Sequence, residues 1–423
     1  VDYISNFTDI NEKIVKRAEE EGMSPEDLAD KYANAFLEDI RDFNIKAADK
    51  YLRVSENIDE IIEMVSVLID KGYAYEAEGN VYFSVEEFED YGKLSGRSLE
   101  DMQAGARIAV KEDKKNPLDF ALWKKVEEGE GWDSPWGEGW PGWHIECSAM
   151  SMKRLGATFD IHGGGVDLIF PHHENEIAQS EAYSGEKFAK YWLHNGTVNL
   201  SGEKMSKSVG NFFTSREVLK EFSGQIIRYF LLTRHYRSPI DFSYEKLEEA
   251  EKSFNRLLNT RRQLAEVLSY DIKSAAESEE NIDFSDKLVQ IQTDYTEAMN
   301  DDFNTAEAIG VLHDFAGYIN GYINQSDFSL NEKNFSILEE AEEIFLELAE
   351  ILGLEFKLEK AELKDDELVP DLVKLLLDLR EKARENKNWE QADMIRDRLA
   401  EIGIEVKDTP RGAEWKFQQK EEN

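Results

Sequence analysis

The residues that could bind a metal ion lie in two short stretches of the sequence. Cys147, the only cysteine among 423 residues, lies within GWHIECSAM, and His172 and Glu176 lie within PHHENE. A spacing of four places the last two side chains on one face of a helix. His173, three residues before Glu176, would serve as well, so spacing alone does not choose between the two histidines. Thiolate, imidazole and carboxylate are zinc ligands, which indicates a site with three protein ligands and one open position.

Two further motifs contain residues suited to binding a nucleotide. HGGGVD includes Gly164 and Gly165, and glycine lets the backbone approach a ligand closely and adopt positive φ. Asp167 follows, and an acidic side chain can bind ribose hydroxyls in nucleotide-binding folds. EKMSKS places Lys204 and Lys207 on a loop flanked by Gly and Ser, where two cations could stabilise a polyphosphate during transfer.

Each motif also has a simpler structural explanation. A lone cysteine is commonly a small buried core residue, and neighbouring histidines at a helix start are commonly solvated. Three glycines are compatible with a plain tight turn, and two loop lysines with a solvated basic surface. The motifs indicate one site only if the fold brings them together.

The first half of the sequence alternates predicted strands and helices, which favours a parallel α/β sheet. DYISNFT is a predicted strand, and a helix follows it with Asp9 as the expected N-cap and Glu12 at the capping-box spacing. TFDIHGGG predicts a strand that enters a triple-glycine turn, and the next helix is predicted to begin at Pro171. YWLHNGTVNL is a further strand. Ligands of such sheets bind beyond the carboxyl ends of strands, so we expect the glycine and lysine motifs to face one crevice.

The second half of the sequence is predicted to be mostly helical. From about 243 to 363 apolar residues recur at three-to-four spacing, which is typical of a helical bundle. A linker is predicted around Pro370. Two helices and a terminal hairpin are predicted to follow it as a small C-terminal domain.

The composition is that of a globular protein, with 41% hydrophobic and 33% charged residues. A single cysteine excludes an internal disulfide framework and suits a reducing cytosol. No apolar run approaches the ~18 residues that span a bilayer. The net charge of −39 argues by itself against a nucleic-acid partner. However, residues 271–370 hold 26 acidic and 6 basic residues whereas residues 371–423 hold 13 and 11, so local basic surfaces stay possible.

Taken together, the motifs resemble those of class I cysteinyl-tRNA synthetases. The resemblance depends on KMSKS after HNGTVNLSGE, with PGWHIECSAM and DIHGGGVDLIFPHHENE upstream, and extends from NFTDINEK through MNDDFNT to RGAEW. It implies an α/β, Rossmann-like catalytic domain, N-terminally incomplete, then an all-α helical bundle and a small α+β C-terminal domain. The resemblance implies four parts. Residues 1–200 would form a catalytic domain with an inserted segment at about 50–130, and residues 201–245 a KMSKS and stem-contact region. Residues 246–369 would form a helical bundle, and residues 370–423 an anticodon-binding domain.

The resemblance also implies a role for each candidate residue. A zinc ion would be bound by Cys147, His172 and Glu176, which favours His172 over His173, and would hold the thiolate of the substrate. The residues near the amino acid would be Thr8 and Trp143. The ATP-binding residues would be Gly164, Gly165, Asp167 and Lys207, and the catalytic loop would contribute Lys204, Ser206 and Lys207. The tRNA-binding residues, at the anticodon, would be Arg384, Trp389, Asp393 and Asp408.

The implied activity is that of a cysteine–tRNA ligase, which activates cysteine with ATP and Mg²⁺ to cysteinyl-adenylate and transfers it to the 3′ end of tRNA(Cys). We expect one zinc ion per chain, L-cysteine, ATP and tRNA(Cys) as partners, no membrane contact, a monomer and a cytoplasmic location. Two alternatives stay open: a related ligase that joins cysteine to an amino sugar, and a tRNA-binding fragment without catalysis. The family's HIGH motif and second zinc-binding cysteine are not found in the sequence, and we expect them in a segment that would precede Val1.

Overall fold

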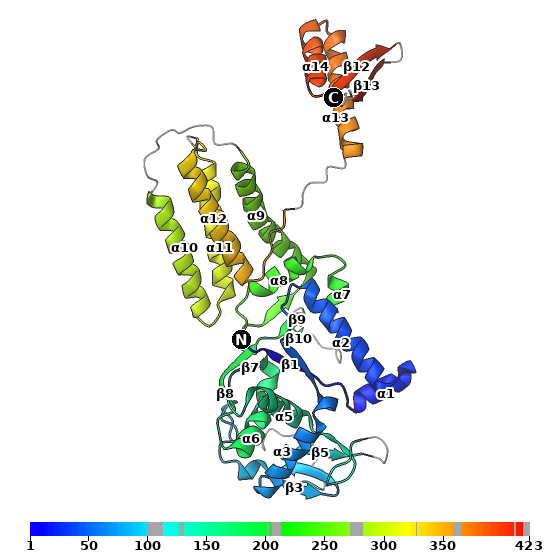
Figure 1. The fold of residues 1–423 in the computed structure, drawn as a ribbon, viewed down its shortest axis with the longest axis vertical. Coiled ribbons are helices and arrows are strands. Elements are labelled where there is room, and N and C mark those ends of the chain that lie inside the picture. The colour runs from blue at the N-terminus through cyan, green and yellow to red at the C-terminus, as the bar shows by residue number, and fades with distance from the viewer. Residues whose placement is uncertain are drawn as a thin grey trace, which may run out of the picture. The chain divides into compact units, whose positions relative to one another are not determined.

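The computed structural model describes most of the chain, namely residues 1–99, 113–126, 131–200, 203–204, 213–270, 282–326, 328–358, 365–409 and 412–417. The chain forms two compact units, Val1–Phe356 and Lys357–Asn423. The first unit contains an α/β portion and a helical bundle, and the second is the small C-terminal unit (Figure 1).

Parallel strand pairs form the part of the first unit that contains most of the predicted motifs. β1 (Ile4–Phe7) pairs with β2 (Lys50–Arg53), and β7 (Phe159–Gly165) pairs with β8 (Ala189–Asn195), both in parallel. A small third sheet has the order β10–β9–β11, formed by Glu203–Lys204, Val198–Leu200 and Ile240–Phe242. The α/β class is thus confirmed, but no strand among the described residues joins the two parallel pairs into one sheet.

Helices connect the two strands of each parallel pair. α1 (Glu12–Glu21) and α2 (Pro25–Asp42) lie between β1 and β2, and α6 (Glu174–Ser184) lies between β7 and β8. Parallel pairing requires such crossovers because the chain must return to the same end of the sheet. α5 (Trp143–Leu155) packs against α6 and against α3 (Ile58–Asp70). The helices that contain Cys147 and Glu176 are therefore neighbours.

An antiparallel four-stranded sheet lies in and just beyond the predicted inserted segment. Its strands are β3 (Ala74–Ala77), β4 (Asn80–Phe83), β5 (Phe120–Lys125) and β6 (Gly139–Pro141). The β3–β4 hairpin turns at Glu78 and Gly79, whose φ angles of 53° and 87° are both positive, as a two-residue type I′ turn requires. Phe83 and Trp123 are fully buried and pack in one core with Ile61 of α3.

The first helix has a different N-cap from the one that the sequence predicted. Asn11 caps α1, and its side chain accepts a hydrogen bond from the Ile14 amide at 3.0 Å. Asp9 instead accepts hydrogen bonds from the hydroxyl and amide of Ser55, at 2.5 and 3.1 Å, which ties the loop after β1 to the end of β2. The prediction of Asp9 was wrong because Asn and Asp are equally good caps, and a partner so distant in sequence cannot be inferred from local spacing.

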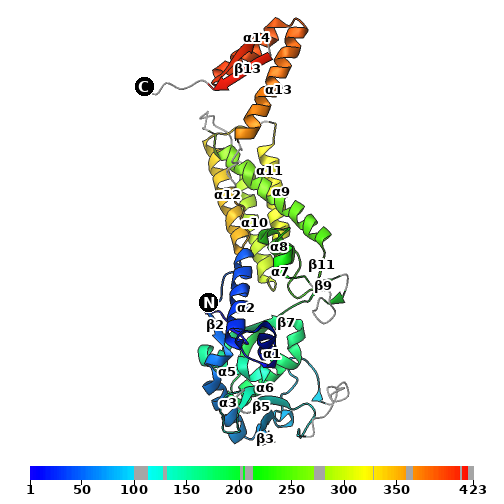
Figure 2. The ribbon, with the colours of Figure 1, turned by 90° about the vertical axis from the view of Figure 1, so that its right-hand side faces the viewer.

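The helical bundle occupies the second half of the first unit. Two short helices lead into it, α7 (Ser215–Val218) and α8 (Gly224–Leu232). Its long helices are α9 (Tyr244–Leu268), α10 (Ile282–Asn300), α11 (Thr305–Ile323) and α12 (Glu332–Ile351). They lie side by side in Figures 1 and 2, and Leu257, Phe315 and Phe345 are buried between them. The bundle predicted from the sequence is confirmed.

The C-terminal unit combines helices and a hairpin, with the elements α13 (Asp365–Glu385), α14 (Trp389–Glu401), β12 (Ile404–Thr409) and β13 (Gly412–Phe417). Its buried core is formed by Val373, Leu399 and Ile404. α13 runs through Pro370, where the sequence predicted a linker. Pro370 is the sixth residue of this helix, a position at which proline removes one amide donor from the helical hydrogen bonds.

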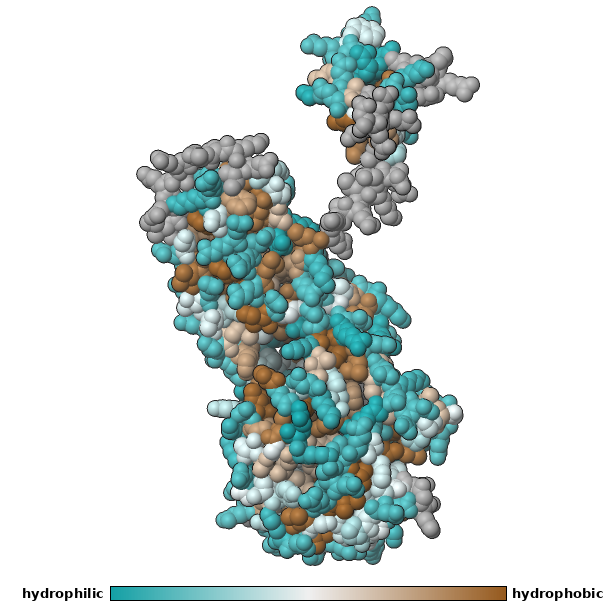
Figure 3. Space-filling view, viewed as in Figure 1, coloured by the Kyte–Doolittle hydropathy of each residue, from teal (hydrophilic) through white to brown (hydrophobic). Residues whose placement is uncertain are grey.

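The face of the molecule drawn in Figure 3 is mostly hydrophilic. Figure 3 shows hydrophilic side chains over most of one face, with hydrophobic ones reaching the surface in small groups. Exposed large apolar side chains of the first unit include Tyr191, Leu231 and Phe303. No helix in the described part of the chain is long and apolar enough to cross a membrane.

Candidate metal centre and active site

The side chains of Cys147, His172 and Glu176 lie close together although they come from three different elements. Cys147 is on α5, His172 is in the short segment η4 (Ile169–His173), and Glu176 is in the first turn of α6. Their sulfur, nitrogen and oxygen ligand atoms all lie within 4.8 Å of one another. His172 is 4% exposed and Glu176 is 0% exposed, so the two polar groups are withdrawn from water beside a thiol.

The hydrogen bonding of these groups fits a bound cation. His172 Nε2 and Glu176 Oε1 are 2.7 Å apart, yet Oε1 has no hydrogen-bond partner among the described residues. The other ring nitrogen of His172, Nδ1, lies 2.8 Å from His144 Nδ1. When Nδ1 donates its proton there, Nε2 presents a lone pair to the site. Lone pairs of nitrogen and oxygen then converge with a sulfur atom, and a metal ion would satisfy all three.

Five of the seven histidines lie in residues 144–194. One of them is the ligand candidate His172, and the other four lie near the three candidate ligands. His162 Nε2 is 2.6 Å from Glu176 Oε2, and His173 Nδ1 is 2.8 Å from His194 Nε2. His162, His173 and Glu176 form a second group of possible metal ligands that overlaps the first. Outer partners of this kind fix the orientation of metal-binding side chains. Sequence reasoning missed His162 and His194, although the clustering of histidines was a signal available in the sequence.

Burial keeps the imidazoles of His144 and His173 neutral. It lowers the pKa of His144 to about 3, with a further contribution from His172, and it lowers the pKa of His173 to about 3. Neutral imidazole is the form that binds metals. Burial raises the pKa of Glu176, but contacts with two histidines lower it more, so this pKa lies below its usual range. The pKa of Cys147 is raised by burial and by the nearby carboxylate, and a bound cation would reverse this by favouring the thiolate.

Two glycines let the elements of the site approach one another closely. A Cβ at Gly142, just before α5, would lie 1.8 Å from the carbonyl oxygen of Ala121, so the helix starts directly against β5. A Cβ at Gly164 would lie 2.7 Å from the ring of His173. Residues 163–165 belong to β7 and their φ angles are not positive, so the predicted triple-glycine turn was wrong. Glycine is needed here for space beside the strand and not for a turn.

The helix predicted to begin at Pro171 begins instead as a wide turn. Ile169–His173 forms η4, a wide turn kinked at Phe170, whose φ of −138° and ψ of 130° are extended, and α6 begins at Glu174. Through this turn, His172 faces His144 and Glu176 whereas the adjacent His173 contacts His194.

The two residues predicted near the amino acid lie at the edge of the same site. Trp143 is the first residue of α5 and is 51% exposed, and its ring centre is 4.4 Å from that of His172. Thr8 follows β1 and donates a hydrogen bond to Glu146 at 3.1 Å. Burial raises the pKa of Glu146 to about 8, and the bond from Thr8 opposes this rise. An exposed indole beside buried ligands can provide an apolar wall for a small side chain.

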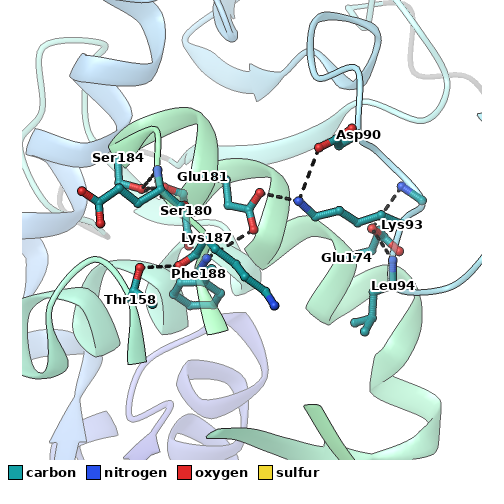
Figure 4. A network of polar contacts seen from close by, with 12 residues as sticks. Asp90, Lys93, Leu94, Thr158, Glu174, Ser180, Glu181, Ser184, Lys187 and Phe188 are labelled. Atoms are coloured by element: carbon teal, nitrogen blue, oxygen red, sulfur yellow. Dashed lines mark hydrogen bonds and ion pairs between the residues drawn. The ribbon is translucent and has the colours of Figure 1, made fainter. Parts of the chain in front are cut away.

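Glu174 fastens the start of α6 to the inserted segment, as Figure 4 shows. Its fully buried carboxylate accepts hydrogen bonds from three backbone amides in residues 92–95, at distances between 2.8 and 3.3 Å. Further along the same helix, Glu181 pairs with Lys93 of that loop. The loop and the helix that contains Glu176 are therefore held as one piece. No sequence pattern indicated this anchor.

Three of the four residues predicted to bind ATP lie at and just after the carboxyl end of β7, with Gly164 and Gly165 in the strand and Asp167 in η3 (Val166–Leu168). This is the edge where ligands of α/β folds bind. Lys204 lies in β10, which pairs with β9 in antiparallel fashion. The other two residues of the predicted catalytic loop, Ser206 and Lys207, lie outside the described residues.

The residues predicted to contact the anticodon lie in the C-terminal unit. Arg384 is in the last turn of α13, and Trp389 begins α14 with its side chain exposed. Asp393 pairs with Arg396 at 3.3 Å. Asp408 lies in β12, and its side chain is outside the described part of the chain. An exposed indole and a guanidinium thus flank one short turn, an arrangement suited to an unpaired base.

Protein-family models match most of the chain. Residues 1–252 match the "tRNA synthetases class I (C) catalytic domain", residues 294–357 the "DALR domain", and residues 366–415 the "Cysteinyl-tRNA ligase anticodon binding domain". Two solved structures share the fold. Mycobacterium tuberculosis methionyl-tRNA synthetase in complex with methionyl-adenylate has a TM-score of 0.60 and 16% identity, and covers 82% of this chain and 83% of its own. A putative arginyl-tRNA synthetase from Campylobacter jejuni has a TM-score of 0.54 and 15% identity, covering 82% and 74%. The fold and the catalytic domain are those of a class I aminoacyl-tRNA synthetase.

Relatives of higher identity specify the amino acid. The cysteine–tRNA ligase of Carboxydothermus hydrogenoformans is 50% identical over 98% of this chain and 86% of the relative. The ligase of Heliobacterium modesticaldum is 51% identical with the same coverage, and that of Thermococcus onnurineus is 48% identical, again over 98% and 86%. The chain belongs to the family of cysteine–tRNA ligases.

Proposed function

We propose that Cys147, His172 and Glu176 bind a zinc ion and that this centre selects cysteine for attachment to tRNA(Cys). The observation that supports this most strongly is the convergence of their ligand atoms, with a buried carboxylate oxygen that lacks a hydrogen-bond partner in the described part of the chain. A soft sulfur ligand with an imidazole and a carboxylate suits zinc. When bound, the ion supplies a Lewis-acidic position for the substrate thiolate, and serine would lose that bond.

The protein residues around the centre orient its ligands. His144 Nδ1 accepts a hydrogen bond from His172 Nδ1 and so turns the Nε2 lone pair of His172 toward the site, and His162 holds the second oxygen of Glu176. Trp143 covers the site with an apolar ring. Because burial keeps His144 neutral, this contact fixes geometry without adding a positive charge beside the metal.

The reaction in this proposal has two steps. The cysteine carboxylate attacks the α-phosphate of ATP to form cysteinyl-adenylate and release pyrophosphate, and a hydroxyl of the tRNA 3′ end then displaces AMP. The protein contributes mainly positioning and stabilisation of charge. Lys204 and Lys207, with Ser206 between them and with Mg²⁺ on the ATP, stabilise the charge of pyrophosphate. The adenosine is held by Gly164, Gly165 and Asp167.

The proposal assigns the two steps and the tRNA to four parts of the chain. Residues 1–200 activate cysteine, residues 201–245 hold the phosphate-binding loop and the acceptor stem, and residues 246–369 form the helical bundle. Residues 370–423 read the anticodon through the exposed side chains of Arg384, Trp389 and Asp393 at and near the α13–α14 turn, and through Asp408 of the hairpin. The near balance of charge in the last part supports this assignment. The monomeric state and the cytoplasmic location stay predictions.

Cysteine-dependent exchange of pyrophosphate into ATP tests the proposal. We expect exchange with cysteine, exchange lower by ~10⁴-fold with serine because the metal bond is lost, and charging of tRNA(Cys). A ligase that uses an amino sugar would show the exchange but no transfer to tRNA(Cys). A fragment that only binds tRNA would show neither exchange nor charging. Either of these two results would contradict the proposal.

A further inference from the structure

A cavity of about 400 Å³ lies where the α/β portion of the first unit meets the helical bundle. Three segments that are distant in the sequence line it: residues 193–198, residues 231–240 and the turn at 303–305 between α10 and α11. Figures 1 and 2 both show that turn at the end of the bundle that faces the α/β portion. The walls are mainly apolar, with contributions from Leu193, Val198, Leu231, Leu232 and Ile240.

The turn at this cavity has a strained backbone. Asp302 and Phe303 have φ angles of 54° and 56°, in the left-handed region that residues with a Cβ rarely adopt. Two successive residues keep such a strained backbone conformation only where contacts with the surrounding structure stabilise it. Asp302 forms an ion pair with Arg237 and accepts a hydrogen bond from the Tyr236 hydroxyl at 2.9 Å. Thr305 donates a hydrogen bond to the carbonyl oxygen of the last residue of α8 at 2.9 Å.

The strained turn presents the Phe303 ring at the cavity without burying it. The side chain lines the cavity and is 49% exposed. Packing of Phe303 in the core therefore does not explain the strained backbone of this turn or the contacts of Asp302 and Thr305 that hold the turn in place. A half-exposed phenyl ring beside an apolar cavity is suited to stacking on a flat ligand.

Arg234 lines the same cavity and is exposed. No carboxylate in the described ranges pairs with its guanidinium, in contrast to the neighbouring Arg237, which is bound to Asp302. Although the chain has a net charge of −39, the Arg234 guanidinium can form an ion pair with a negatively charged group of a ligand. A ring for stacking and a guanidinium for a phosphate are the groups with which proteins bind unpaired nucleotides.

We propose that this cavity binds an unpaired nucleotide of the tRNA, with its base stacked on Phe303 and its phosphate on Arg234. The inference rests on the proposed function, because that function brings a polynucleotide to the chain. A neutral apolar peptide would use the ring but would leave the guanidinium without a partner, so a nucleotide fits both groups better. The site would add a contact at the junction of the α/β portion and the bundle, separate from the anticodon-contacting residues.

Binding of a tRNA(Cys) transcript to the whole chain, measured by fluorescence anisotropy at several salt concentrations, tests this site. Phe303→Gly removes the ring and suits a φ of 56°, so we expect thermal stability to be kept or raised while affinity falls about tenfold. Phe303→Tyr keeps a ring and should bind as the wild type does. Arg234→Gln should weaken binding and lower the slope of log affinity against log salt by about one.

Tyr270→Ala is a matched control, because Tyr270 is an exposed aromatic residue just beyond the far end of α9. It should leave affinity and salt dependence unchanged. Wild-type affinity and salt slope in both Phe303→Gly and Arg234→Gln would overturn the nucleotide site while leaving the proposed function in place. Failure of the unaltered chain to bind tRNA(Cys) would overturn both.

Discussion

Replacing Glu174 by glutamine should loosen the loop at residues 92–95 and, through it, the start of α6. The carboxylate is fully buried, and its oxygens accept hydrogen bonds from the amides of Gly92 at 3.0 Å, Leu94 at 3.3 Å and Ser95 at 2.8 Å. Glutamine has the same shape, but one end of its side chain is an NH₂ donor. At least one buried amide would therefore face another donor.

The expected loss in local stability is ~2 kcal/mol, because a hydrogen bond to a charged acceptor contributes about 1.5–3 kcal/mol. This corresponds to about 30-fold in the equilibrium for opening the loop. Asp90→Asn is a matched control in the same loop. The Asp90 carboxylate is largely exposed and 3.6 Å from the Lys93 amine, and exposed pairs of this kind contribute about 0–1 kcal/mol.

Hydrogen–deuterium exchange of peptides covering residues 91–99 measures this opening directly. We expect the loop amides to exchange about 30-fold faster in Glu174→Gln and at the wild-type rate in Asp90→Asn. Zinc affinity should fall by ~10-fold as well, because Glu176 lies in the same turn of α6. Equal protection of these amides in the wild type and in Glu174→Gln would refute the anchoring role.

The phosphate-binding loop, the C-terminal unit and a buried histidine of the bundle give further tests. Lys207→Ala should slow adenylate formation by ~10²–10³-fold in single-turnover kinetics with little change in cysteine affinity, and the reverse pattern would rule out its role at the phosphates. Removal of residues 365–423 should leave pyrophosphate exchange almost intact while tRNA affinity and its salt dependence fall; an unchanged affinity across a salt titration would exclude the C-terminal unit as the anticodon reader. Burial lowers the pKa of His313, whose imidazole lies 2.7 Å from the Tyr229 hydroxyl. The unfolded chain then binds more protons than the folded one below pH ~6.5, so stability should fall as the pH drops from 7 to 5. His313→Gln should reduce that slope in thermal unfolding, and an equally steep profile would show that His313 does not contribute.

Local spacing predicted contacts within one helical turn and little beyond it. His172 and Glu176, four residues apart, do approach to 2.7 Å. The proximity of Cys147 to both was expected only from the family resemblance, because no spacing rule joins residues on two helices. The N-cap at Asp9 was predicted wrongly for the same reason, since its hydrogen-bond partner Ser55 lies 46 residues later in the short turn after β2.

The contacts that support the site could not be predicted because they depend on the tertiary fold. Glu174 binds amides 79–82 positions earlier in the chain. α6 is polar in sequence and yet buried along most of its length, including Gln179 and Ser180. Ser148 and the His144 carbonyl accept hydrogen bonds from the amide nitrogen of Gln179, whereas Gln179 Oε1 and Ser180 Oγ have no hydrogen-bond partner among the described residues.

The zinc content of the purified chain, compared between the wild type, Cys147→Ser and His173→Gln, tests the central claim most directly. The wild type should retain one zinc ion per chain. Cys147→Ser should lose most of it, because a serine hydroxyl does not replace a thiolate as a zinc ligand. His173→Gln should keep it, because the adjacent His172 is the proposed ligand. Stoichiometric zinc in Cys147→Ser, or equal loss from His173→Gln, would contradict the assignment.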